Sequence, residues 1–193
     1  TDEEYMLRAV ELAKKGTGWT NPNPLVGAVI VKDGRIIGEG YHKKYGELHA
    51  EREALASANE DVSGATIYVT LEPCCHYGKQ PPCVNAIIEA GIKKGVIGSY
   101  DPNPLVAGKG VDILREHNIP VDDKLVCSEE CKILNYVFFN YIKEKKPYVI
   151  LKYAQSLDGK IATHTGLSQW IPGETARNKV HMDRHRYSAV MVG

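Results

Sequence analysis

Three short stretches of the sequence carry residues that could bind and use a zinc ion. His49 is followed two positions later by Glu51, Cys74 follows one proline, and Cys83 follows two. One imidazole and two thiolates are typical zinc ligands, and a site with only three protein ligands keeps its fourth position for water. A nearby carboxylate can then carry protons between that water and a substrate. We therefore predict metal ligands His49, Cys74 and Cys83, with Glu51 as the catalytic proton carrier.

The order of these residues matches the signature H-x-E followed by P-C-x-x-C, which is typical of zinc nucleobase deaminases. This chain has a wider gap between its two cysteines. A regular helix would turn His49 and Glu51 about 200° apart, so both can face a metal only at the first turn of a helix. Cys75 is a rival for Cys74, but the ligand in the signature directly follows the proline. If Cys75 or His76 were a fourth ligand, the site would be closed and structural.

Composition excludes several classes of function. Among 193 residues, Lys plus Arg (24) balance Asp plus Glu (24), which disfavours a general nucleic-acid binder. The sequence contains no apolar run of about 18 residues, so no membrane span is predicted. The acidic N-terminus does not resemble a secretory signal. Three of the five cysteines crowd between residues 74 and 83, which favours metal binding over disulfides. We expect a cytoplasmic protein with no nucleic-acid or membrane partner.

Helical and strand patterns alternate over the first 145 residues. We expect Asp2 to cap a first helix that Gly16 closes, and a hairpin to follow. The hairpin strands are residues 25–31 and 35–41. The later elements are helices over 49–58, 81–89, 110–117 and 128–143, and strands over 65–71, 95–100 and 119–122. This order predicts an α/β sandwich with a mixed sheet.

Pro147 begins a second segment. Residues 147–162 have the pattern of a strand, a turn and a short strand, residues 173–188 that of a helix, and a further strand starts at Ala189. These elements cannot close a core alone, because too few of them are present to bury one another's apolar faces. We therefore expect residues 146–193 to be the incomplete start of another domain.

Two similar strings, NPNPLVGA at 21–28 and DPNPLVAG at 101–108, admit two interpretations. Both can be ordinary turns set by proline before apolar residues. Alternatively, both turns present Asn23, Asp101 and Asn103 to one pocket. The residues alone favour neither interpretation over the other.

The loop HYGKQPP between the two cysteine ligands, residues 76–82, should lie over the pocket. Lys79 in this loop is a point charge suited to a phosphate, although most loop lysines are simply solvated. His42, which follows the second hairpin strand, is open to the same two interpretations.

Four strings together resemble the bifunctional riboflavin-biosynthesis deaminase–reductase family. They are HAE (49–51), TLEPCCHYGKQPPC (70–83), DPNPLVAGKG (101–110) and SLDGKIA (156–162). The long cysteine spacing is that of this family, in which position 75 is more often serine. For residues 1–145 the resemblance implies a cytidine-deaminase-like three-layer sandwich. This domain would remove the exocyclic amine of a diamino-pyrimidinone carrying ribosylamine phosphate, giving the amino-uracil and ammonia.

The resemblance also implies roles for further residues. The positions that would contact this small-molecule pyrimidine ribotide are Asn23, His42, His76, Lys79, Asp101 and Asn103. Residues 146–193 would begin a dihydrofolate-reductase-like domain that uses NADPH to open the ribose ring to a ribityl chain. There Ala154 and Trp170 would bind the cofactor, and Lys152, Ser168 and Arg184 the substrate. We expect the 193-residue chain alone to show no NADPH-dependent reduction.

The family further suggests a homo-oligomer, either a dimer or a tetramer. The rival enzymatic interpretation is a zinc deaminase of cytidine, deoxycytidylate, guanine or a transfer-RNA base. The long loop with Lys79 and the SLDGKIA string argue against this rival, and the neutral charge disfavours transfer RNA.

Overall fold

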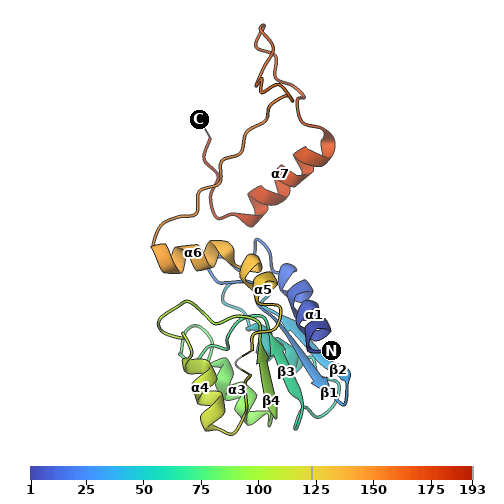
Figure 1. Ribbon diagram of the computed structural model, residues 1–193, viewed down its shortest axis with the longest axis vertical. Helices are drawn as coiled ribbons and strands as arrows, with labels where there is room; N and C mark the ends of the chain where they lie inside the picture. The colour runs from blue at the N-terminus through green and yellow to red at the C-terminus, as the bar shows by residue number, and fades with distance from the viewer. Residues whose placement is uncertain (123, 193) are drawn as a thin grey trace. The chain divides into compact units, whose positions relative to one another are not determined.

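The computed structural model describes residues 1–122 and 124–192, in two compact units, Thr1–Lys146 and Pro147–Gly193. The first unit is built on a four-stranded sheet in the order β2-β1-β3-β4 (Figure 1). Its strands are β1 (Gly27–Lys32), β2 (Arg35–Tyr41), β3 (Thr66–Val69) and β4 (Lys94–Ile97). β1 runs antiparallel to β2 and β3, whereas β3 and β4 are parallel. The predicted mixed sheet is confirmed.

Alternate side chains of the strands feed two separate cores. Ala28 and Ile30 of β1 join the core that apolar residues of α2, α3 and α4 close, whereas Val29 and Val31 join a core with α1 and α5. The helices are α1 (Asp2–Lys14), α2 (Ala50–Ala56), α3 (Cys83–Glu89), α4 (Lys109–Glu116) and α5 (Ser128–Leu134). Since neighbouring side chains of a strand point to opposite faces, the result is the predicted three-layer sandwich.

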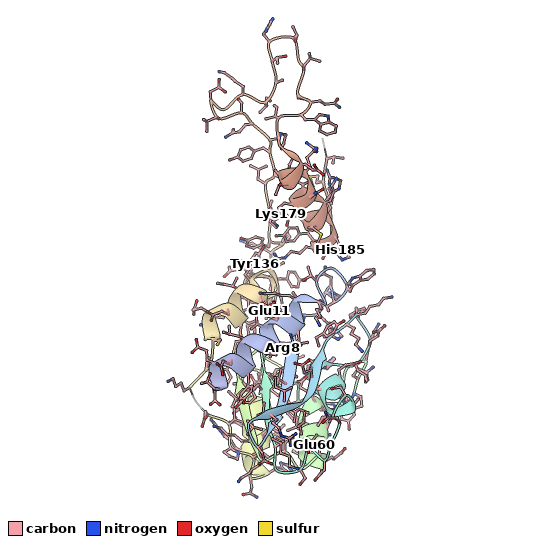
Figure 2. All side chains as sticks on the ribbon, turned by 90° about the vertical axis from the view of Figure 1, so that its right-hand side faces the viewer. Arg8, Glu11, Glu60, Tyr136, Lys179 and His185 are labelled. Atoms are coloured by element: carbon pink, nitrogen blue, oxygen red, sulfur yellow. The ribbon has the colours of Figure 1, made fainter. Side chains whose placement is uncertain are left out.

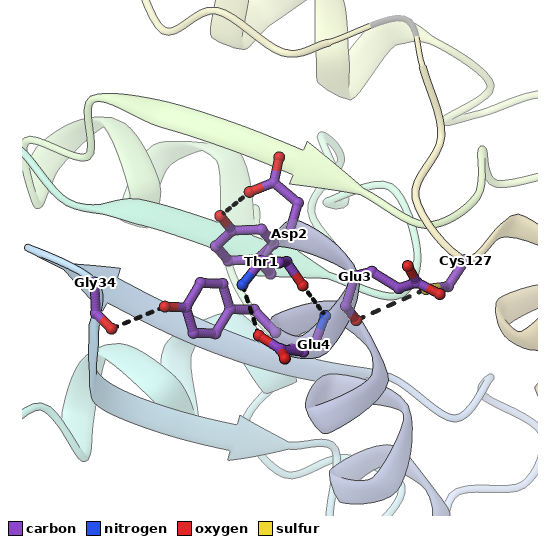
Figure 3. A network of polar contacts seen from close by, with 8 residues as sticks. Thr1, Asp2, Glu3, Glu4, Gly34 and Cys127 are labelled. Carbon is purple, nitrogen blue, oxygen red and sulfur yellow. Dashed lines mark hydrogen bonds and ion pairs between the residues drawn. The ribbon is translucent and has the colours of Figure 1, made fainter.

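The first helix is capped one residue earlier than the sequence pattern predicts. The Thr1 hydroxyl accepts a hydrogen bond from the Glu4 amide (3.3 Å), and the Glu4 carboxylate accepts one from the Thr1 amine (2.7 Å), as in a capping box (Figure 3). Asp2 instead accepts a hydrogen bond from the Tyr68 hydroxyl at 2.6 Å. The predicted cap at Asp2 is wrong because its carboxylate is engaged by a strand distant in sequence.

A bidentate ion pair joins α1 to β2. The Arg8 guanidinium, labelled on α1 in Figure 2, donates to both carboxylate oxygens of Glu39, at 2.6 and 2.9 Å. Hydrogen bonding to Arg8 lowers the pKa of Glu39. The pair is exposed, and exposed pairs typically contribute about 1 kcal/mol or less. Burial of α1 against the sheet is therefore the larger stabilising contribution.

The single helix predicted over residues 128–143 is wrong. Two helices, α5 and α6 (Tyr136–Glu144), meet at Asn135. This residue is 4% exposed, and its side chain donates to the Leu25 carbonyl and accepts from the Leu25 amide, both at 2.7 Å. Because these two bonds pair the side chain with a distant turn, Asn135 leaves the helical backbone conformation and separates the helices.

Replacing Asn135 by alanine should lower the free energy of unfolding by about 2 kcal/mol, since both Leu25 backbone groups would lose their partner. Urea unfolding monitored by circular dichroism measures this change. The matched control is Asn140→Ala on α6, which should change stability by less than about 0.5 kcal/mol. Equal effects of the two substitutions would contradict this role of Asn135.

The second unit differs from its predicted pattern. Its one regular element among the described residues is α7 (Glu174–Arg186), and the strands predicted within 147–162 and from Ala189 are not formed there. Gly193, the end of the last predicted strand, lies outside the described residues. A strand needs a hydrogen-bonded neighbour, and the described part of this unit supplies none. Leu151 and Leu157 are correspondingly exposed.

Two smaller points complete the comparison of sequence and fold. The strand predicted over 119–122 is reduced to one parallel bridge between Gly95 and Val121. Among the described residues, no helix combines the length and apolar character needed to cross a bilayer.

Candidate active site

Three potential metal ligands converge beside the sheet. Nδ1 of His49 lies 3.5 Å from Sγ of Cys74 and 3.3 Å from Sγ of Cys83, and all three ligand atoms lie within 4.8 Å of one another. Cys74 follows β3, whereas Cys83 is the first residue of α3. One imidazole nitrogen and two sulfurs at these separations form a donor set that fits zinc.

The backbone at the start of α2 lets His49 and Glu51 face the same place. His49 is the N-cap residue, with an extended backbone (φ −76°, ψ 161°), so its side chain does not follow the helical rotation. Glu51 lies within the first turn, is 3% exposed and lines the same cavity as His49. The geometric condition that the sequence imposed on this pair is met.

The two thiols differ in their surroundings. Hydrogen bonding from Cys83 and His49 lowers the pKa of Cys74 to about 4, and the Cys83 amide also donates to its sulfur at 3.3 Å. The hydrogen bond to Cys74 and burial raise the pKa of Cys83. A divalent cation among the three ligands would supply the positive charge that a second thiolate needs, because metal binding displaces thiol protons. The site is therefore built for a cation.

Cys75 and His76 do not close the site. The Cys75 thiol points to the Leu105 carbonyl at 3.6 Å, and among the described residues the metal-ligating group contains neither Cys75 nor His76. Three ligands leave one tetrahedral position open, which is the arrangement of catalytic rather than structural zinc.

Burial raises the pKa of Glu51 to about 7, with a further contribution from the neighbouring Cys74 charge. A carboxyl group of this pKa can both accept and donate a proton near neutral pH. Its position and its acidity therefore suit a proton carrier.

A cavity of about 320 Å³ opens beside the ligands. Six further residues that the sequence singled out line it, namely Asn23, His42, His76, Lys79, Asp101 and Asn103. The sheet explains this convergence. The parallel strands β3 and β4 end at the edge where the antiparallel β1 begins, so the segments that follow β3 and β4 meet the turn before β1. Both proline turns therefore reach one pocket.

His42 lies beside the metal-ligating residues and has a polar partner at each ring nitrogen. Its Nδ1 lies 3.0 Å from the Leu48 carbonyl and its Nε2 lies 3.2 Å from the Asn23 amide nitrogen. The tautomer that satisfies both carries its proton on Nδ1. Burial lowers the pKa of His42, and its ring meets that of His49 edge-on with centroids 5.3 Å apart. His42 thus orients the Asn23 side chain and packs against the ring of His49.

The loop between the cysteines is tied to the loop after β2. The Lys79 ammonium lies 4.1 Å from the centroid of the Tyr45 ring, and the Gln80 amide donates to the Gly46 carbonyl at 3.1 Å. Tyr45, Gly46 and Gln80 line the cavity, although no sequence pattern predicted this. A tyrosine and a glycine in a loop carry no specific sequence signal, because only the fold brings them to Lys79.

Phe138 of α6 also lines the cavity and was missed. In the sequence, Phe138 has the spacing of an ordinary apolar position on a helix. The break at Asn135 separates α6 from α5 and attaches it to the turn before β1. The aromatic wall of the pocket therefore depends on a contact between residues far apart in the chain.

Burial raises the pKa of Asp101 from its ordinary value of 3.8 to about 6. The folded chain thus holds this proton more tightly than the unfolded chain, so the group favours folding below about pH 4 and loses that contribution as the pH rises through 6. Relative to wild type, Asp101→Asn should gain about 1–2 kcal/mol of stability between about pH 4 and pH 7, allowing for partial solvent screening. Urea unfolding across this range tests it, and a difference that does not vary with pH would contradict it.

The residues expected to belong to a reductase all lie in the second unit. Lys152, Ser168, Trp170 and Arg184 are exposed, and Ala154 is half-buried. Trp170 packs against the Arg177 guanidinium, 4.7 Å from its ring centroid. The assignment of these five residues to a reductase site stays a prediction.

Comparison with known proteins gives the class to which this site belongs. The family described as "Cytidine and deoxycytidylate deaminase zinc-binding region" matches residues 1–99, and the RibD C-terminal domain matches residues 147–193. The chain belongs to the cytidine and deoxycytidylate deaminase zinc-binding family.

The individual relatives are riboflavin-biosynthesis proteins. The chain is 61% identical to the riboflavin biosynthesis protein RibD of Actinobacillus pleuropneumoniae, over 100% of this chain and 51% of that protein. A diaminohydroxyphosphoribosylaminopyrimidine deaminase/5-amino-6-(5-phosphoribosylamino)uracil reductase of Thermotoga maritima is 56% identical, with a TM-score of 0.91 over 97% of this chain and 54% of that one. RibD of Acinetobacter baumannii is 50% identical, with a TM-score of 0.88 over 95% of this chain and 51% of that one. The predicted resemblance is confirmed, and the chain spans about half the length of the curated relatives it matches.

Proposed function

We propose that the first unit catalyses zinc-dependent hydrolytic deamination of a diamino-pyrimidinone ribosylamine phosphate, a step of riboflavin biosynthesis. The observation that carries this proposal is the three-ligand group of His49, Cys74 and Cys83, two of which, His49 and Cys74, line one cavity with the buried carboxyl group of Glu51. We also propose that this deaminase domain ends at residue 145.

Glu51 moves the protons of this reaction. Zinc, when bound by these three ligands, supplies the Lewis acidity that lowers the pKa of a water toward about 7. Glu51 accepts a proton from the attacking water and passes it to a ring nitrogen of the pyrimidine. It then takes the second proton of that water from the hydroxyl group now on the ring carbon and delivers it to the amine, so that the C–N bond breaks, ammonia leaves and the C–O bond becomes a carbonyl. Its burial excludes bulk water from these transfers.

The cavity residues divide into two groups in this proposal. Asn23, Asp101 and Asn103 offer amide and carboxyl groups to the edge of the pyrimidine. Lys79, which the Tyr45 ring holds at the cavity, offers a positive charge to the phosphate. His42 and His76 complete the polar lining. This arrangement suits a substrate that joins a polar heterocycle to an anionic group.

For the whole protein we propose a second activity, NADPH-dependent reduction of the ribosyl group to a ribityl chain. The match of residues 147–193 to the RibD C-terminal domain supports it. Ala154 and Trp170 would contribute to the cofactor site, and Lys152, Ser168 and Arg184 to the substrate site. These residues are spread along the second unit, between residues 152 and 184.

We also propose a cytoplasmic homo-oligomer, a dimer or a tetramer. All five cysteines are free thiols, which suits a reducing compartment. Exposed apolar side chains on α5 and α6, Ile133 (66%) and Tyr141 (54%), offer contact area to another copy. Light scattering of the purified protein distinguishes a monomer, which would refute the oligomer, from the two assemblies.

Ammonia release tests the deaminase proposal. The purified zinc-loaded protein is incubated with the diamino-pyrimidinone ribotide, or with cytidine, deoxycytidylate or guanine. We expect turnover of the ribotide alone, because the cavity pairs Lys79 with the polar turns. Preferred turnover of another base would replace the proposed substrate, and no turnover by protein of full zinc content would refute the activity.

A further inference from the structure

Glu72 is a buried carboxylate whose bonding resembles that of a bound anion. It is 3% exposed and lies two residues before the ligand Cys74. Its Oε2 accepts hydrogen bonds from the amides of Asp101 (3.3 Å) and Gly108 (2.9 Å). Its Oε1 accepts from the amides of Gly110 (3.0 Å) and Val111 (3.3 Å). All four donors belong to the backbone of one distant segment, residues 101–111.

This segment carries the cavity residues Asp101 and Asn103, and its Leu105 carbonyl also accepts a hydrogen bond from the Cys75 thiol at 3.6 Å. Within it, the Asn103 amide donates to the Asp101 carboxylate at 2.8 Å, and the Leu105 amide donates to the Asn103 side chain at 3.1 Å. These short-range bonds shape the loop but do not place it relative to the metal ligands. The bonds to Glu72 do, because Glu72 is joined through Pro73 to Cys74.

Gly110 shows how closely the two segments approach. A Cβ atom at this position would lie 2.2 Å from the Pro73 carbonyl oxygen, well inside contact distance. The start of α4 therefore packs against the backbone that leads directly to Cys74. The same contact lets the Gly110 and Val111 amides reach Glu72.

We propose that Glu72 is a positioning residue for the reaction, which holds loop 101–108 in register with the zinc ligands and so sets where Asp101 meets the substrate. Glu72 borders the cavity, but each of its carboxylate oxygens already accepts two backbone hydrogen bonds, so we assign its role to holding the loop and not to binding substrate. This inference rests on the proposed deamination for its kinetic readout but not for its structural readout.

The first test is the isosteric substitution Glu72→Gln. The substitution replaces one carboxylate oxygen by an NH2 group, which cannot accept hydrogen bonds from the two backbone amides that face it. The loop should therefore lose two of its four bonds to residue 72, while the volume of the side chain is kept. We expect kcat/KM for the ribotide to fall about 10- to 100-fold, mainly through KM, at unchanged zinc content. The control Ile30→Val, in the core of β1, should lower stability with KM unchanged.

A double mutant separates positioning from general damage. If Glu72 acts through Asp101, then Glu72→Gln combined with Asp101→Asn should lose little more than Asp101→Asn alone. Multiplied losses would overturn the proposal, as would a KM for Glu72→Gln equal to that of wild type. Gly110→Ala moves the start of α4 away from an intact Glu72 and should raise KM in the same way, which provides the test if Glu72→Gln does not fold.

Amide hydrogen exchange gives a readout that needs no substrate. In Glu72→Gln the amides of Asp101, Gly108 and Gly110 should exchange at least about 10-fold faster, whereas those of β1 should keep their rates. Unchanged protection would overturn the positioning role. Absence of ribotide turnover by the wild-type protein would refute the proposed function alone, and the exchange result would still decide the role of Glu72.

Discussion

Glu51→Gln should lower kcat for deamination by about 10³-fold or more while zinc content stays at the wild-type level. The substitution keeps the shape of a side chain that is 3% exposed but removes its ability to carry protons. General acid–base catalysis typically contributes about 10²–10⁴-fold, and in the proposed mechanism Glu51 serves in more than one proton transfer. A 10³-fold loss corresponds to about 4 kcal/mol of transition-state stabilisation. Steady-state ammonia release and metal analysis of the same preparation measure the two quantities.

The matched control for this experiment is Glu53→Gln, two residues further along α2. Glu53 forms an ion pair with Lys43 at 2.6 Å and does not line the cavity. Its substitution should change kcat by less than about twofold, since surface pairs contribute little. A Glu51→Gln protein that retains a tenth of the wild-type kcat would show that another group carries the proton.

Cys83→Ser should abolish both zinc binding and deamination. Cys83 is fully buried, and its sulfur lies 3.3 Å from Nδ1 of His49. A serine hydroxyl does not ionise at neutral pH and leaves two strong ligands, too few to hold zinc against a chelator. Metal analysis after dialysis should fall from about one zinc per chain to near zero, and activity should fall below detection.

Cys75→Ser is the matched control for the loss of a ligand. The Cys75 thiol faces the Leu105 carbonyl and lies outside the metal-ligating group. This variant should therefore keep its zinc and its activity. If Cys75→Ser lost zinc and Cys83→Ser kept it, the assignment of the ligands would be wrong.

Much of the site follows from short-range order in the sequence. The ligands and proton carrier stand in compact motifs next to prolines and helix starts, where local backbone rules already limit their conformation. The α/β sandwich with a mixed sheet could be predicted from the order of the elements, and the three layers were implied by the family resemblance. The continuous apolar run from Ala28 to Val31 fits a strand that is buried on both faces. The roles of the site residues remain predictions that the experiments above address.

Other features depended on contacts between distant segments. The backbone leaves the helix at Asn135 because its side chain pairs with Leu25, a contact that no local pattern indicates. The same contact brings Phe138 to the cavity, and the meeting of two loops brings Tyr45 to Lys79.

The sequence by itself determined which residues can bind zinc and carry protons, since residue type and near-neighbour spacing specify that chemistry. Only the tertiary structure decided which polar groups share the pocket. The edge where β3 and β4 end and β1 begins collects segments that are far apart in the chain. Glu72 illustrates the difference. In the sequence it is one acidic residue before a Pro-Cys pair, and in the fold its two oxygens bind four amides of the loop that carries Asp101.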